Sequence, residues 1–113
     1  MNFKETQGLK KDSDFRRVYR QGKSVANRLL VMYTLPNKSE KNRDGISVSK
    51  KVGKANIRNK ARRRIKESYR LNIDGSIKSG YDIVFIARVA IKDVEYADIE
   101  KAMKHLVKKA NLY

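Results

Sequence analysis

Residues 46–71 read ISVSKKVGKANIRNKARRRIKESYRL, and this stretch decides the fold that the sequence predicts. Its first four residues alternate between apolar and polar side chains, which is typical of a half-buried strand. From residue 55 to residue 71, apolar residues recur every four positions and would form one stripe along a helix. The members of this stripe are Ile57, Ala61, Ile65 and Tyr69. The stretch therefore predicts a strand that leads into a long amphipathic helix.

On both sides of this stretch the chain alternates between further helices and strands, judged by the spacing and length of its apolar runs. The sequence predicts helices at 12–20, 55–71 and 96–110, strands at 28–36, 46–49 and 81–89, and polar connections at 37–45 and 72–80. The turn at 37–45 favours an antiparallel pairing of the strands on either side of it. With one more short strand on the N-terminal side, we expect an α+β fold in a single domain over residues 1–113. Its single sheet of about four strands would be packed with three helices.

The composition indicates a partner with many negative charges. The chain has 113 residues, 28 Lys and Arg against 12 Asp and Glu, and a net charge of +16. Self-repulsion at this charge destabilises a compact state, and nucleic acid is a partner that relieves it. The absence of cysteine fits a reducing compartment. Because no apolar run is long enough to span a membrane and residues 1–11 lack the apolar core of a signal peptide, we expect a cytoplasmic protein.

The positive charge is concentrated in residues 50–70, which hold ten Lys and Arg residues and the single acid Glu67. Arg58, Arg62 and Lys66 are spaced four apart, so they line one side of the predicted helix. A charge run is usually a solvated face, but this one is nearly of one sign and lies beside an apolar stripe. The stripe is too narrow for a membrane-surface or calmodulin-binding helix. The segment therefore favours binding of phosphate, which an arginine fork can contact through two hydrogen bonds.

Several blocks in this chain resemble the protein subunit of bacterial ribonuclease P. The blocks are Asp14-Phe15 with Tyr19, Ser24-Val25-Ala26-Asn27-Arg28, Val31-Met32-Tyr33-Thr34, Ser47 to Ala55, Arg58-Asn59-Lys60 with Arg62-Arg63, and Tyr81 to Arg88. The chain differs from the family pattern at Lys60 and Lys66, where arginine is usual and the fork is lost. The resemblance implies a βαβ crossover of left-handed sense, which is the opposite of the general rule.

The resemblance also implies the function. It implies a protein subunit that binds the catalytic RNA of ribonuclease P and the 5′ leader of precursor tRNA, without catalytic residues or a metal of its own. Magnesium ions are expected in the partner RNA, and the protein is expected to be a monomer bound to one RNA. The RNA-binding residues would be Lys51, Lys54, Arg58, Asn59, Lys60, Arg62, Arg63, Lys66 and Arg70, and the leader cleft would contain Phe15, Tyr19, Tyr33 and Ser49. Aromatic rings in a positive groove suit single-stranded RNA, although rings at this spacing also fit core packing.

Three other functions are compatible with some of these features. A nuclease acting through the protein itself lacks a nucleophile with a base and an orienting group, and the only histidine, His105, is expected at the surface. DNA binding is weakly supported because the basic helix lacks the preceding helix and turn of a helix-turn-helix. A structural RNA-binding protein, such as a ribosomal protein, would share the size, the charge and the basic helix, and this alternative remains open at the level of the sequence.

Overall fold

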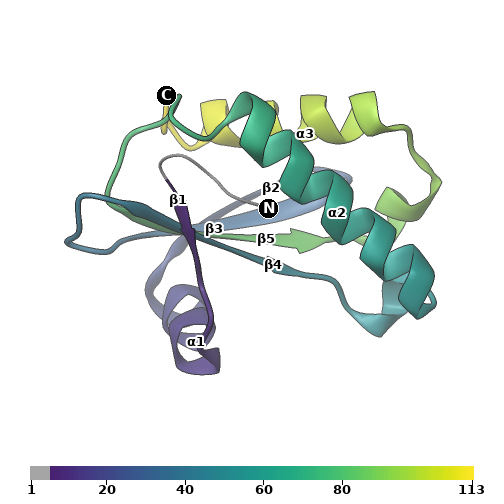
Figure 1. Ribbon diagram of the computed structural model, residues 1–113, viewed down its shortest axis with the longest axis horizontal. Coiled ribbons are helices and arrows are strands. Elements are labelled where there is room, and N and C mark those ends of the chain that lie inside the picture. Colours follow the sequence, from purple (N-terminus) through teal and green to yellow (C-terminus); the bar gives the residue numbers. More distant parts are fainter. Residues whose placement is uncertain (1–5) are drawn as a thin grey trace.

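The computed structural model describes residues 6–113 and contains a five-stranded mixed sheet with helices on both faces (Figure 1). The strands are β1 (Thr6–Gly8), β2 (Lys23–Ala26), β3 (Leu30–Pro36), β4 (Asn42–Ser47) and β5 (Tyr81–Ala87). The helices are α1 (Asp12–Gln21), α2 (Ala55–Asn72) and α3 (Tyr96–Lys109), with the 3-10 turns η1 (Lys50–Val52) and η2 (Val89–Asp93). The predicted α+β class and the three predicted helices are confirmed. No helix within residues 6–113 is long and apolar enough to cross a membrane.

The sheet has one strand more than the four that the sequence predicted. Its order is β1-β4-β5-β3-β2, so two short strands, β1 and β2, form its edges, where the sequence predicted one short strand on the N-terminal side. β1 has three residues and β2 has the sequence KSVA, and neither contains an apolar run. Strands this short and polar are typical of sheet edges, where they discourage pairing with other chains.

The predicted antiparallel pair is wrong, because β5 lies between β3 and β4. β3 pairs with β5 in antiparallel register from Leu30 opposite Ala87 to Pro36 opposite Tyr81. β4 pairs with β5 in parallel register, and α2 is the crossover connection that this parallel pairing requires. The left-handed sense of this crossover stays a prediction from the family resemblance.

The start of β4 was also misread, since the sequence placed residues 42–45 in a turn. Asn42, the first residue of β4, is buried, and its side chain forms two hydrogen bonds with the chain before β5 and at its start. Its Nδ2 donates to the backbone oxygen of Lys78 at 3.0 Å, and its Oδ1 accepts from the backbone N–H of Tyr81 at 2.9 Å. These bonds join β4 to the segment that precedes β5, and they are invisible in a local pattern.

The main core lies between the sheet and the pair α2 and α3, as the predicted apolar stripes require. Ile65 and Tyr69 of α2 are fully buried, as are Ile99, Met103 and Leu106 of α3. Tyr69 packs edge-to-face on Phe85 of β5, with 6.1 Å between ring centroids. On the other face, α1 covers a smaller cluster of Leu9, Val18 and Val84, and Phe15 and Tyr33 pack at its margin. This thin second layer leaves aromatic rings near the surface.

Candidate RNA-binding site

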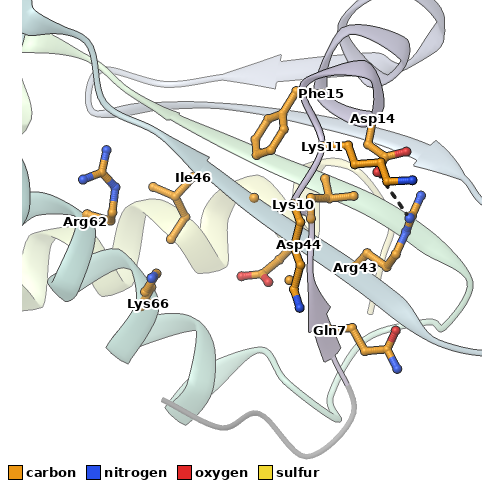
Figure 2. A pocket seen from close by; sticks show the side chains of 13 residues that line it. Gln7, Lys10, Lys11, Asp14, Phe15, Arg43, Asp44, Ile46, Arg62 and Lys66 are labelled. Atoms are coloured by element: carbon orange, nitrogen blue, oxygen red, sulfur yellow. Dashed lines mark ion pairs between the residues drawn. The ribbon is translucent and has the colours of Figure 1, made fainter.

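A groove opens at the β1–β4 edge of the sheet, between α1 and α2 (Figure 2). β1 pairs only with residues 42–44, so within residues 6–113 no strand lies along Gly45 to Ser47 on the side of β4 that faces away from β5. The groove has a volume of about 950 Å³. It is lined by Gln7, Gly8, Leu9, Lys10, Lys11, Asp14, Phe15, Arg43, Asp44, Gly45, Ile46, Arg62 and Lys66. One wall of the groove thus comes from the sheet face that α1 covers, and the other comes from the face that α2 covers.

Cations stand on both sides of the groove. Arg62 and Lys66 lie one turn apart on α2, and Lys10 and Lys11 lie between β1 and α1. Arg62 Nη1 donates to Asn59 Oδ1 at 3.4 Å, which orients its fork. Among the ion pairs of residues 6–113, none involves these four cations. They are therefore available to phosphate groups.

Three aromatic rings form a row that begins with Phe15 in the groove and continues through Tyr19 of α1 to Tyr33 of β3. Phe15 lies 6.5 Å from Tyr19, and Tyr19 lies 5.2 Å from Tyr33, centroid to centroid. Burial raises the pKa of Tyr19, whose hydroxyl also forms a hydrogen bond with Ser47. Phe15 and Tyr33 contact the small core cluster as well, so each ring has one packed side. The three rings predicted for one cleft do lie together.

Phe15 reaches the groove because β4 has a glycine beneath it. A Cβ atom at Gly45 would come within 2.5 Å of the Phe15 ring, closer than side chains approach one another. The ring therefore packs directly on the backbone of β4, with Arg62 on the opposite wall (Figure 2). This contact places an aromatic ring and the basic helix in a single groove.

Asp44 is a buried acid in this basic groove, and the sequence analysis did not single it out. Only 6% of the residue is exposed, and its carboxylate points toward the α2 side of the groove. Burial raises its pKa to about 7, although Lys66 acts in the opposite direction. Neighbouring Asp74 adds to the rise. Burial thus favours the neutral form of the Asp44 carboxyl far more than in an exposed aspartate.

Asp82 is a second buried acid that the sequence analysis left without a role. It lies at the start of β5, is fully buried, and accepts hydrogen bonds from Arg43 and from Asn37 Nδ2 at 3.0 Å. Arg17 of α1 also donates to it, at 3.3 Å. Burial acts to raise the pKa of Asp82, but these donors together hold it below its ordinary value. The carboxylate ties α1 to the sheet and so fixes one wall of the groove.

The structure separates the other predicted residues from the groove. None of them lines it: Lys51 is exposed on η1, Lys54 is exposed just before α2, Asn59, Lys60 and Arg63 are exposed on α2, and Arg58 is half-buried. Arg70 forms an ion pair with Glu67 at 2.5 Å. Ser49 is exposed at the start of η1 and is not among the groove residues. The predicted set therefore includes residues that line the groove and basic residues outside it, and we call Lys51, Lys54, Arg58, Lys60 and Arg63 the outer face of α2.

Comparison with known proteins identifies the family of this fold and groove. A family model described as Ribonuclease P matches residues 3–111. The chain belongs to the ribonuclease P protein family. The ribonuclease P protein component of Clostridioides difficile (strain 630) is 64% identical over 112 residues, covering 99% of this chain and 98% of that protein. This result removes the ribosomal-protein alternative.

Solved structures of ribonuclease P proteins share the fold. The Staphylococcus aureus protein, solved at 2.0 Å, is 42% identical with a TM-score of 0.87, covering 94% of this chain and 96% of that one. The Thermotoga maritima protein is 33% identical with a TM-score of 0.83, covering 91% and 96%. As a ribonuclease P protein, the chain is a subunit of an RNA-based endonuclease in tRNA 5′ processing, and the ribonuclease P RNA is its partner.

Proposed function

We propose that the groove binds the single-stranded 5′ leader of precursor tRNA, while the outer face of α2 binds the ribonuclease P RNA. The observation that carries this proposal is that Phe15 of α1 and Arg62 and Lys66 of α2 line the same groove. Single strands are held where bases stack on aromatic rings and cations follow the backbone. The groove offers both kinds of contact within one cavity, and the row from Phe15 to Tyr33 extends the stacking surface.

The outer face of α2 suits a folded RNA. Arg58 and Arg63 can each contact phosphate with a fork, whereas Lys60 supplies a single point charge. Lys51 and Lys54 extend this surface onto η1 and the segment after it. The surface and the groove share α2, so the leader would lie beside the RNA subunit, where the bond to be cut must be presented.

In this proposal the RNA subunit performs the cleavage and holds the magnesium ions. The acidic residues near the groove are either paired with arginine or buried. Asp14 pairs with Arg17 and Arg43, Asp82 is held by the same two arginines, and Asp44 is buried, which raises its pKa to about 7. We further propose one protein per RNA, a cytoplasmic location, and neither DNA nor membrane as a partner.

The proposal is tested by cleavage of precursor tRNA at low magnesium concentration by a bacterial ribonuclease P RNA. We expect strong stimulation by this protein and none by an equally basic unrelated protein. Equal stimulation by both would show only charge screening and would contradict the proposal. Cleavage by the protein freed of all RNA would contradict the assignment of catalysis to the RNA. In the same assay, precursor with a leader shortened to one nucleotide should gain little from the protein.

A further inference from the structure

A second basic surface lies on α3, away from the groove. Between residues 101 and 109, α3 carries four lysines and no acid. Lys101, Lys104 and Lys108 are exposed and lie on one stripe of the helix, because they are spaced by three, four and seven positions. The opposite side of the helix holds its buried residues, among them Met103 and Leu106.

The helix dipole does not account for this stripe. Cations are favoured in the last turn of a helix, which explains Lys108 and Lys109. Lys101 and Lys104 lie in the middle of α3, which runs from Tyr96 to Lys109, beyond the reach of that effect. Like charges three and four positions apart repel, so the stripe destabilises the isolated helix. Binding of an external anion to these lysines would offset their repulsion and stabilise the helix.

The basic surface continues from α3 onto the β2–β3 turn. Lys109 Nζ donates to the backbone oxygen of Ala26 at 3.4 Å, and Asn27 Nδ2 donates to the backbone oxygen of Ala102 at 3.0 Å. Arg88 Nη1 donates to the backbone oxygen of Asn27 at 3.1 Å. These bonds bring the exposed Arg88 and Arg28 beside α3. We call Arg28, Arg88, Lys101, Lys104, Lys108 and Lys109 the α3 surface.

The α3 surface and the groove lie at opposite edges of the sheet. The groove is at the β1–β4 edge, and the β2–β3 turn belongs to the other edge in the order β1-β4-β5-β3-β2. Within residues 6–113, no ion pair involves any of the six cations of the α3 surface. A short single strand of RNA bound in the groove would not cover the α3 surface.

We propose that the α3 surface binds a second segment of RNA phosphate backbone, so that the protein holds two separate segments of folded RNA at opposite edges of its sheet. Four of its six cations are lysines, which neutralise phosphate as point charges without the geometry of a fork. The α3 surface therefore contributes affinity that depends on salt and not on sequence. This inference rests on the proposed function only in taking RNA as the partner.

The test compares four full-length proteins for binding to a bacterial ribonuclease P RNA over a range of KCl concentrations. They are the wild type, the triple variant Lys101→Gln, Lys104→Gln and Lys108→Gln, the control triple Lys41→Gln, Lys78→Gln and Lys92→Gln, and Arg63→Ala on the outer face of α2. Both triples remove three positive charges from exposed lysines, and glutamine keeps the helix propensity of lysine. Thermal melts establish that each variant folds, and hydroxyl-radical footprints show which RNA segment is protected.

We expect the α3 triple to lower the slope of log affinity against log salt by about 2, since each phosphate contact contributes about 0.7–0.9. It should also lose protection at an RNA segment that Arg63→Ala leaves protected. The inference is overturned if the α3 triple matches the control triple in slope and footprint. It is also overturned if the α3 triple binds RNA normally but loses binding to phosphatidylserine vesicles. If Arg63→Ala, on the outer face of α2, also binds like the wild type, the proposed binding of this RNA by α2 fails.

Discussion

Arg43 of β4 meets Asp82 of β5 through two hydrogen bonds, from Nε at 2.8 Å and from Nη2 at 2.7 Å. The two residues are directly opposite in the parallel register of their strands. Bidentate pairing of this kind is among the strongest that side chains form. Because Arg17 of α1 reaches the same carboxylate, one buried acid joins the helix that carries Phe15 to the strand that lines the groove.

Replacing Asp82 with Asn should destabilise the protein by about 3 kcal/mol or less, since removing one partner of a buried pair costs about 3–5 kcal/mol and both arginines are partly exposed. The pKa of Asp82 is lowered by folding, so its contribution is present above the ordinary value of 3.8 and is lost as pH falls through the folded pKa. Urea unfolding at several pH values measures both effects. Asp93→Asn, at an exposed acid, is the control, and equal losses in the two variants would refute the role of Asp82.

The stability that Asp44 contributes should change with pH in the opposite direction from that of Asp82. Its pKa rises from 3.8 to about 7 on folding, so the stability that the neutral form provides is complete below pH 3.8 and is lost as pH rises through about 7. Asp44→Asn cannot ionise, so its stability relative to the wild type should improve from pH 4 to pH 8. The change should be on the order of a few kcal/mol at most. A difference that stays constant over this range would show that Asp44 is ionised throughout.

Phe15→Ala should weaken holoenzyme binding of precursor tRNA much more than binding of mature tRNA. Loss of one stacked base costs about 1–3 kcal/mol, or roughly 5- to 150-fold in affinity. Phe15→Tyr keeps the stacking surface and should retain most of the affinity. Equal weakening for both RNAs would identify Phe15 as a packing residue only, and thermal melts of each variant would report that packing separately.

Gly45→Ala should act through Phe15. The added Cβ would lie 2.5 Å from the ring, so the ring must move away from β4. We expect precursor tRNA to lose affinity while mature tRNA does not. In the double variant with Phe15→Ala, the two losses should not add, because the ring that the methyl group displaces is absent. Additive losses would mean that Gly45 affects the leader by another route.

Arg62→Ala should weaken holoenzyme binding of precursor tRNA and lower the salt slope of that binding by about one phosphate contact. Arg62→Lys keeps the charge without the fork, so it should restore the slope more fully than the affinity. Lys92→Gln, at an exposed lysine outside the groove and the α3 surface, serves as the matched control. An unchanged slope in Arg62→Ala would place this residue outside the interface.

The parts of the fold that were predicted depend on local periodicity. Ile65 and Tyr69 are buried because they fall on the stripe of a regular helix, which any 3.6-residue pattern reveals. The position of β5 between β3 and β4 depends on which strands pair, and a pattern along the chain does not encode this. Likewise, Asp44 and Asp82 are polar residues whose burial is set by distant partners, so no local signal marks them.

In the candidate site, too, some features follow from local patterns and others depend on distant parts of the chain. The concentration of charge on α2 and the spacing of Phe15 and Tyr19 are readable in the sequence, and the rings were assigned to one cleft through the family resemblance. Their meeting with Arg62 and Lys66 across β4 depends on Gly45 and on the short β1, which only the sheet reveals. Ser49 precedes the 3-10 turn η1 and is not among the residues that line the groove, so its place in the leader cleft stays a prediction.

The central position of β5 also determines when the groove can form as the chain is synthesised. β3 and β4 are made first, but each lacks its shared neighbour until residues 81–87 emerge, after the whole of α2. Contacts so far apart in sequence form late, because the intervening loop must be closed first. A nascent chain ending before β5 therefore carries the charge of α2 without a complete groove, and it would attract RNA before it could select a leader.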